Sequence, residues 1–283
     1  MEKYIDLHTH SNKSDGSMTP KELVNHAKEM GLSAISLTDH DNTDGVREAI
    51  LEGKKTGLEV VPGIELSAKS ETETHILGYY VDIENKEFNE KLEIIKKQRI
   101  ERNYDTERLL NQNGINVSIE EASGFAGGVL LGRAHFAKAM VEKGYVESVK
   151  DAFDRYLSNG RPCYSSLQNH TAAECVKIIN CAGGMAFVAH LHLIRKSDSE
   201  LFAFLKELKE AGLCGIEGYY TDYTPKMQET YLKMAKELDL LVSGGTDFHA
   251  EMKPHISIGK GLGNMKIPYS LLENMKEWRS MNR

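Results

Sequence analysis

The segment Asp6-Leu7-His8-Thr9-His10 constrains this chain most, because it sets two histidines two residues apart in a strand-like run. Side chains alternate between the two faces of a β-strand, so His8 and His10 point the same way. Two imidazoles on one face can hold a metal ion. Asp15 follows in a short polar loop that can fold back over that ion. Taken alone the motif is a weak signal, because two half-exposed histidines would give the same pattern.

Five further apolar segments repeat this arrangement, with histidine or an acidic residue at one end. The residues are Asp39-His40-Asp41, Glu65, His75, His190 and the pair Asp247 and His249. Imidazole and carboxylate are ligands of zinc, manganese and iron. A random scatter would place some of these side chains in the middle of helices. Their position at strand ends therefore favours one shared metal site.

Composition excludes several classes of protein. A net charge of −7 and a pI near 5.9 argue against binding to long duplex nucleic acid or to a membrane surface. A small phosphorylated ligand or a short oligonucleotide stays open, since metal ions can supply local positive charge. The sequence shows no apolar membrane span and no signal peptide, and its cysteines have no C-x-x-C spacing. We therefore expect a cytoplasmic protein without disulfides or thiolate zinc.

Strand and helix patterns alternate along most of the 283 residues. Thr19-Pro20-Lys21-Glu22 is a capping box that predicts the start of a helix, and a second helix is predicted from about residue 44 to 56. The alternation resumes at Met185. About seven strand–helix units, with reactive residues at strand ends, predict an α/β fold: a distorted (β/α)7 TIM-like barrel.

The middle of the chain interrupts this alternation. A long charged helical pattern runs from about residue 85 to 114, and two shorter helices are predicted at 133–143 and 148–157. We interpret residues 86–165 as a mostly helical insertion domain, and residues 1–85 with 166–283 as the discontinuous barrel. The charged run from Glu84 to Arg108 is interpreted as a solvated helix face. Insertions at a barrel mouth often shape substrate choice.

These motifs resemble those of the PHP (polymerase and histidinol phosphatase) superfamily over nearly the whole chain. Gly132-Arg133-Ala134-His135-Phe136 and the segment Asp151–Leu157 resemble the branch of stand-alone phosphoesterases. That branch includes nucleoside 3′,5′-bisphosphate phosphatases and 5′→3′ oligoribonucleases. The resemblance implies a metal-dependent phosphoric ester hydrolase that acts on a nucleotide or a short oligonucleotide.

The resemblance also implies a set of metal ligands, each with a counterpart here. They are His8, His10, Asp15, His40, Glu65, His75, His190, Asp247 and His249. By resemblance, His8, His10, Glu65 and Asp247 hold one ion, Glu65, His75 and His190 a second, and Asp15, His40 and His249 a third. Two to three divalent ions are expected, and manganese, iron and zinc all suit these nitrogen and oxygen donors.

The expected mechanism follows from such a site. Clustered divalent ions lower the pKa of water toward neutrality, so hydroxide can attack phosphorus and release an alcohol. The residues expected to act in catalysis are Asp15, His40, Glu65, His190, Asp247 and His249. Arg133 and His135 are expected to bind the phosphate, with a surface ion pair or a helix-start cap as the alternative. Asp39 is expected to orient His40 or another ligand, and Glu217 to support the site from outside.

Other functions stay open at this point. A phosphatase acting on histidinol phosphate or a sugar phosphate would use the same ligands. A hydrolase of amide bonds also uses His-x-His, but usually with a metal-bridging lysine at a strand end, whereas Lys69 and Lys196 fall in predicted loops. A non-catalytic metal-binding module would be marked by lost ligands, and none of the expected ligands is lost.

Overall fold

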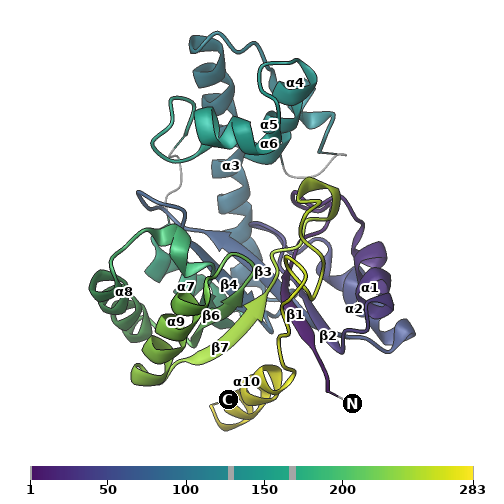
Figure 1. Ribbon diagram of the computed structural model, residues 1–283, viewed down its shortest axis with the longest axis vertical. Helices are drawn as coiled ribbons and strands as arrows, with labels where there is room; N and C mark the ends of the chain where they lie inside the picture. The colour runs from purple at the N-terminus through teal and green to yellow at the C-terminus, as the bar shows by residue number, and fades with distance from the viewer. Residues whose placement is uncertain (1, 127–130, 166–169, 283) are drawn as a thin grey trace.

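The computed structural model describes residues 2–126, 131–165 and 170–282. Its centre is a seven-stranded sheet in the order β1 to β7, which curves into a nearly closed barrel (Figure 1). The strands are β1 (Ile5–Thr9), β2 (Ala34–Leu37), β3 (Glu59–Ser67), β4 (His75–Tyr79), β5 (Met185–Val188), β6 (Gly215–Tyr220) and β7 (Leu241–Gly245). The predicted distorted seven-stranded barrel is confirmed.

The barrel departs from strict strand–helix alternation at β4. This strand follows β3 through a loop without a helix, and it runs antiparallel to both β3 and β5, while the other neighbours are parallel. Its first residue, His75, therefore lies at the same end of the barrel as the last residues of the parallel strands. The reversed strand explains how a histidine at a strand start joins a site built from strand ends.

The two ends of the sheet meet beside the predicted ligands. Thr9 forms an isolated parallel bridge with Phe248, whose carbonyl accepts a 2.9 Å hydrogen bond from the backbone N–H of His10. Below them, the buried carboxylate of Asp6 accepts hydrogen bonds from the backbone N–H and the hydroxyl of Thr246. These bonds hold the first and last ligand segments of the chain together.

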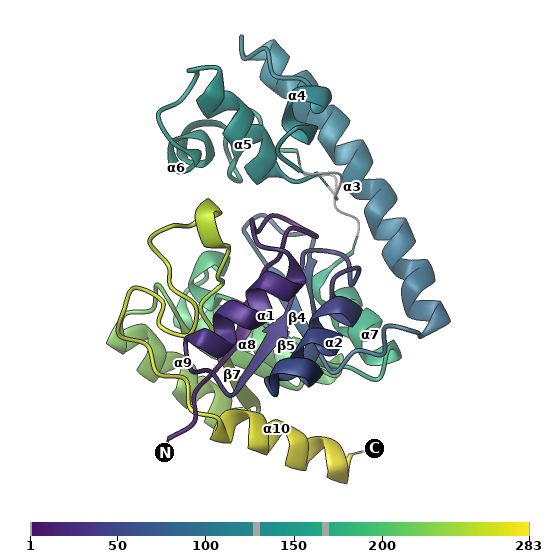
Figure 2. The same ribbon diagram turned by 90° about the vertical axis from the view of Figure 1, so that its right-hand side faces the viewer.

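Helices surround the barrel wall. They are α1 (Pro20–Glu29), α2 (Val46–Thr56), α7 (Ala172–Cys181), α8 (Asp198–Glu210) and α9 (Pro225–Glu237), and short 3-10 turns span Leu191–Ile194 and Ala250–Met252. The predicted capping box at the start of α1 is present, with Thr19 and Glu22 bonded reciprocally. Helix α10 (Ser270–Met281) lies at the end of the barrel opposite the site, near both chain ends (Figure 2). Within the described ranges, no helix is both long enough and apolar enough for a membrane span.

A mostly helical unit stands over the other end of the barrel (Figures 1 and 2). It consists of α3 (Lys86–Gln112), α4 (Ile119–Ser123), α5 (Arg133–Glu142), α6 (Val149–Ala152) and a π-helical turn over Phe153–Leu157. Its apolar side chains form a cluster of their own, which includes Leu110, Phe136, Met140 and Leu157. The boundaries 86 and 165 stay a prediction, because residues 166–169 lie outside the described residues.

The expectation of a solvated face along α3 is wrong in part. Arg99 and Arg102 are 6% and 4% exposed, because this part of the helix faces the barrel mouth rather than solvent. Charged residues are seldom buried without a partner. For Arg99 the partner is Asp41 on the barrel, whose carboxylate lies 2.7 Å from the guanidinium.

Candidate metal centre

Glu65 of β3 lies at the centre of the predicted ligands and is 1% exposed. Its Oε1 lies 2.8 Å from Nδ1 of His75 and 3.1 Å from Nε2 of His190. Its Oε2 lies 3.2–3.3 Å from ring nitrogens on the other side, those of His8, His10 and His40. One carboxylate therefore lies between two sets of imidazoles, as a bridging ligand would.

Asp247 adds a second carboxylate to the His8 and His10 side. Its Oδ1 lies 3.2 Å from Nε2 of His10 and 3.5 Å from Nε2 of His8. Potential ligand atoms of His8, His10, Glu65 and Asp247 all lie within 4.8 Å of one another. This group coincides with the set that the resemblance assigns to one ion.

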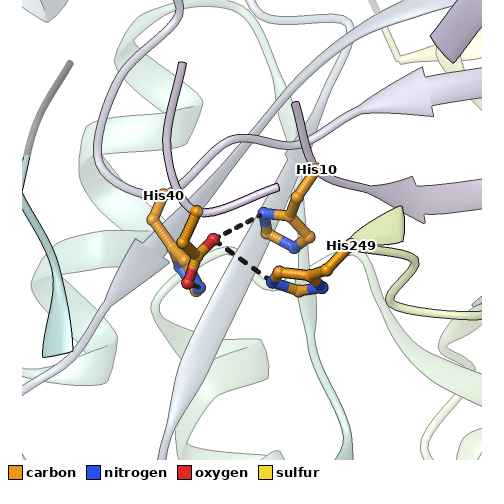
Figure 3. Close-up of side chains that lie close together, drawn as sticks. His10, His40 and His249 are labelled. Atoms are coloured by element: carbon orange, nitrogen blue, oxygen red, sulfur yellow. Dashed lines mark ion pairs between the residues drawn. The ribbon is translucent and has the colours of Figure 1, made fainter. Parts of the chain in front are cut away.

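Asp15 forms a further group from the loop after β1. Its Oδ1 lies 3.2 Å from Nε2 of His249 and 3.8 Å from Nδ1 of His10, and its Oδ2 lies 3.8 Å from Nε2 of His40 (Figure 3). The loop thus folds back over His10, the residue that follows β1. All nine predicted ligands meet in one place, and His10 also lies in the group expected for Asp15, His40 and His249.

Glu73 is an acidic residue of this place that the sequence interpretation missed. Its carboxylate, His75 and His190 offer ligand atoms within 4.8 Å of one another. Glu73 stands two residues before His75, the spacing that singled out His8 and His10. Because Glu73 precedes β4 in an exposed loop rather than ending an apolar run, the pattern of ligands at strand ends does not single it out.

The residues present fit a divalent metal. Several buried polar atoms of the group have no hydrogen-bond partner: Nε2 of His8, Nε2 of His10, Nδ1 of His40, Oδ1 of Asp15 and Oε2 of Glu65. A buried polar atom without a partner is costly, and here the orphaned atoms converge. Nitrogen and oxygen donors without sulfur suit manganese, iron or zinc. A bound cation would satisfy these atoms together.

The charges of the group are strongly coupled. Burial raises the pKa of Glu65, but the surrounding histidines, His40 first, outweigh it and hold that pKa well below its usual range. Burial lowers the pKa of His10, but Asp247 and Glu65 raise it to about 9. The neighbouring carboxylates therefore favour a protonated His10 when no cation is present, and a metal ion would displace that proton.

Asp39 acts on the loop rather than on His40. Its carboxylate accepts hydrogen bonds from the backbone N–H of Ser11 at 2.8 Å, the hydroxyl of Ser11 at 2.7 Å and the hydroxyl of Ser14 at 2.6 Å. These bonds fix the loop that carries Asp15. Of the two expected partners, His40 or another ligand, the hydrogen bonds of Asp39 favour the second, because they hold the loop of Asp15 and not His40.

Seven of the nine predicted ligands, all except His8 and His10, line the floor of a cavity of about 290 Å³. The helical unit supplies the facing wall, in which Arg99, Arg102 and Arg133 line the cavity. Lys253, from the turn after β7, also lines it. Sequence reasoning singled out Arg133 and missed the other cations, because their approach to the site depends on how α3 and the last turn pack.

His135 has the contact of a helix cap. Its Nδ1 accepts a 2.9 Å hydrogen bond from the backbone N–H of Gly132, the residue that precedes α5. Burial lowers the pKa of His135 to about 4, which keeps the ring neutral and able to accept this bond. His135 is not among the residues that line the cavity, whereas its neighbour Arg133 is. Of the roles expected for His135, the contacts therefore favour a cap at the start of α5 over a phosphate contact.

Known proteins similar to this chain include enzymes that cleave phosphate esters. The family model of the PHP domain matches residues 6–255. A 5′-3′ exoribonuclease of Haemophilus influenzae is 32% identical over 93% of this chain and 95% of its own length. A 3′,5′-nucleoside bisphosphate phosphatase of Chromobacterium violaceum is 31% identical over 87% of both chains.

A solved structure shares the whole architecture. It is named as an amidohydrolase from Chromobacterium violaceum with bound sulfate and no metal. It superposes with a TM-score of 0.87 at 29% identity, and the match covers 98% of this chain and 96% of that one. The helical unit is thus included in the shared fold, together with the barrel.

Proposed function

This chain belongs to the PHP domain family, and we propose that it hydrolyses a phosphate ester of a nucleotide or short oligonucleotide with the help of bound divalent ions. One observation carries the proposal: the Glu65 carboxylate lies between two sets of buried imidazoles on the floor of a cavity whose facing wall holds arginines. Acidic ligands attract metal ions, and arginines pair with phosphate. The activities of the two relatives support the same class of substrate.

Three groups of residues would hold the ions in this proposal. The first is His8, His10, Glu65 and Asp247, the second Glu65, His75 and His190, and the third Asp15, His40 and His249. Manganese, iron or zinc would suit each group. When bound, such ions lower the pKa of water and offset negative charge on a phosphoryl group.

The chain's own side chains would position the ester. Arg133, on the wall that faces the floor, would pair with a phosphate through its planar guanidinium. Residues 86–165 would act as an insertion that closes over the floor and limits the size of the substrate. A small phosphorylated substrate rather than long duplex nucleic acid, and a cytoplasmic location, belong to the same proposal.

Product formation tests the proposal directly: inorganic phosphate is measured for the monoesters, and mononucleotides are measured for the RNA. Metal-free protein is reconstituted with Mn²⁺ and given adenosine 3′,5′-bisphosphate, AMP, histidinol phosphate and a short 5′-phosphorylated RNA. We expect inorganic phosphate from the bisphosphate or mononucleotides from the RNA, and neither product with Asp247→Ala, which lacks a predicted ligand. Circular dichroism of both proteins checks that they are folded.

The other outcomes separate the alternatives. Release from histidinol phosphate alone would favour a phosphatase of non-nucleotide substrates. If no product forms from any ester while Mn²⁺ still binds, the proposal is overturned and a non-catalytic metal-binding module is favoured.

A further inference from the structure

A tight turn after β7 brings the chain back to the site. Ala250 has a φ of +53°, in the left-handed region that a residue with a Cβ rarely adopts, and its carbonyl accepts a 3.1 Å hydrogen bond from the backbone N–H of Lys253. The N–H of Glu251 donates to the hydroxyl of Ser17 at 3.0 Å, which ties the turn to the loop after β1. These contacts define where the Lys253 side chain begins.

The two carboxylate oxygens of Asp247 face different partners. Oδ1 lies 3.2 Å from Nε2 of His10 and 3.3 Å from Nδ1 of His249. Oδ2 accepts a 2.6 Å hydrogen bond from Nζ of Lys253 and a 3.0 Å hydrogen bond from the hydroxyl of Tyr220. One carboxylate thus separates the Lys253 ammonium from the predicted ligand atoms. A phosphoryl group held at those atoms would be a close neighbour of the ammonium.

Lys253 differs from the arginines of the cavity in where it comes from and what it contacts. Arg99 is paired with Asp41 at 2.7 Å, and Arg133 donates to the carbonyl of Leu157 at 3.3 Å. Both belong to the helical unit. Lys253 comes from the barrel, contacts a predicted ligand, and keeps 35% of its side chain exposed at the cavity. Its ammonium therefore lies where it could contact the phosphoryl group of a substrate.

We infer that Lys253 is a further catalytic residue, whose ammonium donates a hydrogen bond to a non-bridging oxygen of the phosphoryl group. The inference rests on the proposed function. In the reaction, water attacks phosphorus, the bond from phosphorus to the ester oxygen breaks, and the leaving alcohol takes up a proton from water. Lys253 keeps its own proton throughout. It stabilises the negative charge on the phosphoryl oxygens through a charge-assisted hydrogen bond.

Two kinds of measurement on the Mn²⁺-loaded protein test this role. For Lys253→Gln we expect kcat/KM to fall about 10- to 100-fold, the range of a hydrogen bond to a charged group. We expect the affinity for inorganic phosphate, measured by isothermal titration calorimetry, to fall in parallel. The manganese content should stay unchanged. Lys253→Arg, which keeps the charge, should retain part of both quantities.

Two matched controls isolate the contact. Tyr220→Phe removes the other donor to Oδ2 of Asp247, so it measures how much the orientation of that carboxylate matters by itself. Lys260→Gln makes the same change of charge at an exposed residue that does not line the cavity. Both should lower the affinity for phosphate far less than Lys253→Gln does.

The opposite result is equally clear. If Lys253→Gln loses manganese but binds phosphate as tightly as the parent once the metal is restored, Lys253 only positions Asp247 and the inference is overturned. An effect equal to that of Lys260→Gln would overturn it too. If the parent protein hydrolyses none of the esters, the proposed function fails by itself, and the phosphate titration still decides the role of Lys253.

Discussion

Oε1 of Glu217 lies 2.9 Å from Nδ1 of His8, and both side chains are fully buried beneath the candidate metal centre. Because a carboxylate oxygen accepts hydrogen bonds, Nδ1 of His8 donates to Glu217, and Nε2 is the ring atom that faces Glu65 and could bind a metal ion. The other oxygen of Glu217 accepts a 2.7 Å hydrogen bond from the backbone N–H of His190. A single carboxylate therefore orients two of the predicted ligands.

Glu217→Gln should weaken metal binding without unfolding the barrel. A Gln side chain has one accepting oxygen, so it can satisfy only one of the two donors, His8 or His190. Loss of such an orienting partner typically costs 10- to 100-fold in metal affinity. Calorimetric titration with Mn²⁺ measures the change, and Glu229→Gln, at an exposed position of α9, is the control. Equal affinities for the two variants would contradict the role given to Glu217.

Mn²⁺ should stabilise the fold, and Glu65 should be required for most of the effect. A ligand that binds only the folded state, at 100 times its Kd, adds about 2.7 kcal/mol to the free energy of unfolding. We therefore expect the melting temperature to rise with Mn²⁺ and to fall back with a chelator. Glu65→Gln should largely lose the rise, because Glu65 contacts ligands on both sides of the centre. A melting temperature that stays unchanged when Mn²⁺ is added would show that the cluster is not a metal site.

The strand-end ligands could be predicted because their positions depend on local order. His8 and His10 share a face by strand periodicity, and parallel strands bring their ends to one edge of the barrel. Lys253 and Arg99 reach the same cavity for reasons that no local pattern contains. The first depends on a turn with a left-handed alanine, and the second on the direction in which α3 leaves the barrel.

The same limit explains the interpretations of His135 and Asp39. A Gly-Arg-x-His motif before a helix suits both a phosphate contact and a cap, and only the packed position of the His135 ring separates them. Asp39 stands next to His40 in the sequence, but its hydrogen bonds go to Ser11 and Ser14 in the loop after the neighbouring strand β1. Both residues lie in the segment after β2, where no strand periodicity relates neighbouring side chains, so adjacency in sequence is a poor guide to contact.

Asp41→Asn should loosen the helical unit from the barrel. Asp41 has a φ of +56°, which Asn also tolerates, so the backbone should be kept. The substitution leaves the buried Arg99 without its ionised partner, and breaking such a pair costs about 3–5 kcal/mol. Urea unfolding measures the loss. In the double variant Asp41→Asn with Arg99→Met part of the stability should return, and strictly additive losses would show that the pair is not coupled.

Arg133→Ala should raise KM by about tenfold or more and leave the manganese content unchanged. Arg133 lines the cavity from the wall that faces the predicted ligands, and its guanidinium stacks on Tyr164 at 5.0 Å from the ring centre. Stacking fixes the plane of the group and leaves its edge available to a phosphate. Steady-state kinetics measure the effect, with Arg161→Ala at an exposed site as control. Unchanged KM and kcat would remove Arg133 from the substrate contacts.

His135→Gln should flatten the dependence of stability on pH between about 4 and 6.5. Burial lowers the pKa of His135 from 6.5 to about 4, so folding favours the neutral ring. Its contribution is complete above pH 6.5 and is lost as the pH falls toward 4, by about 3 kcal/mol in all. Gln at this third helical position can still accept the N–H of Gly132, but it does not titrate. We compare the free energy of unfolding of the two proteins at pH 5 and pH 7.5. The difference between them separates the contribution of His135 from that of the other histidines. Parallel losses of stability in both proteins would mean that His135 does not act as a neutral cap.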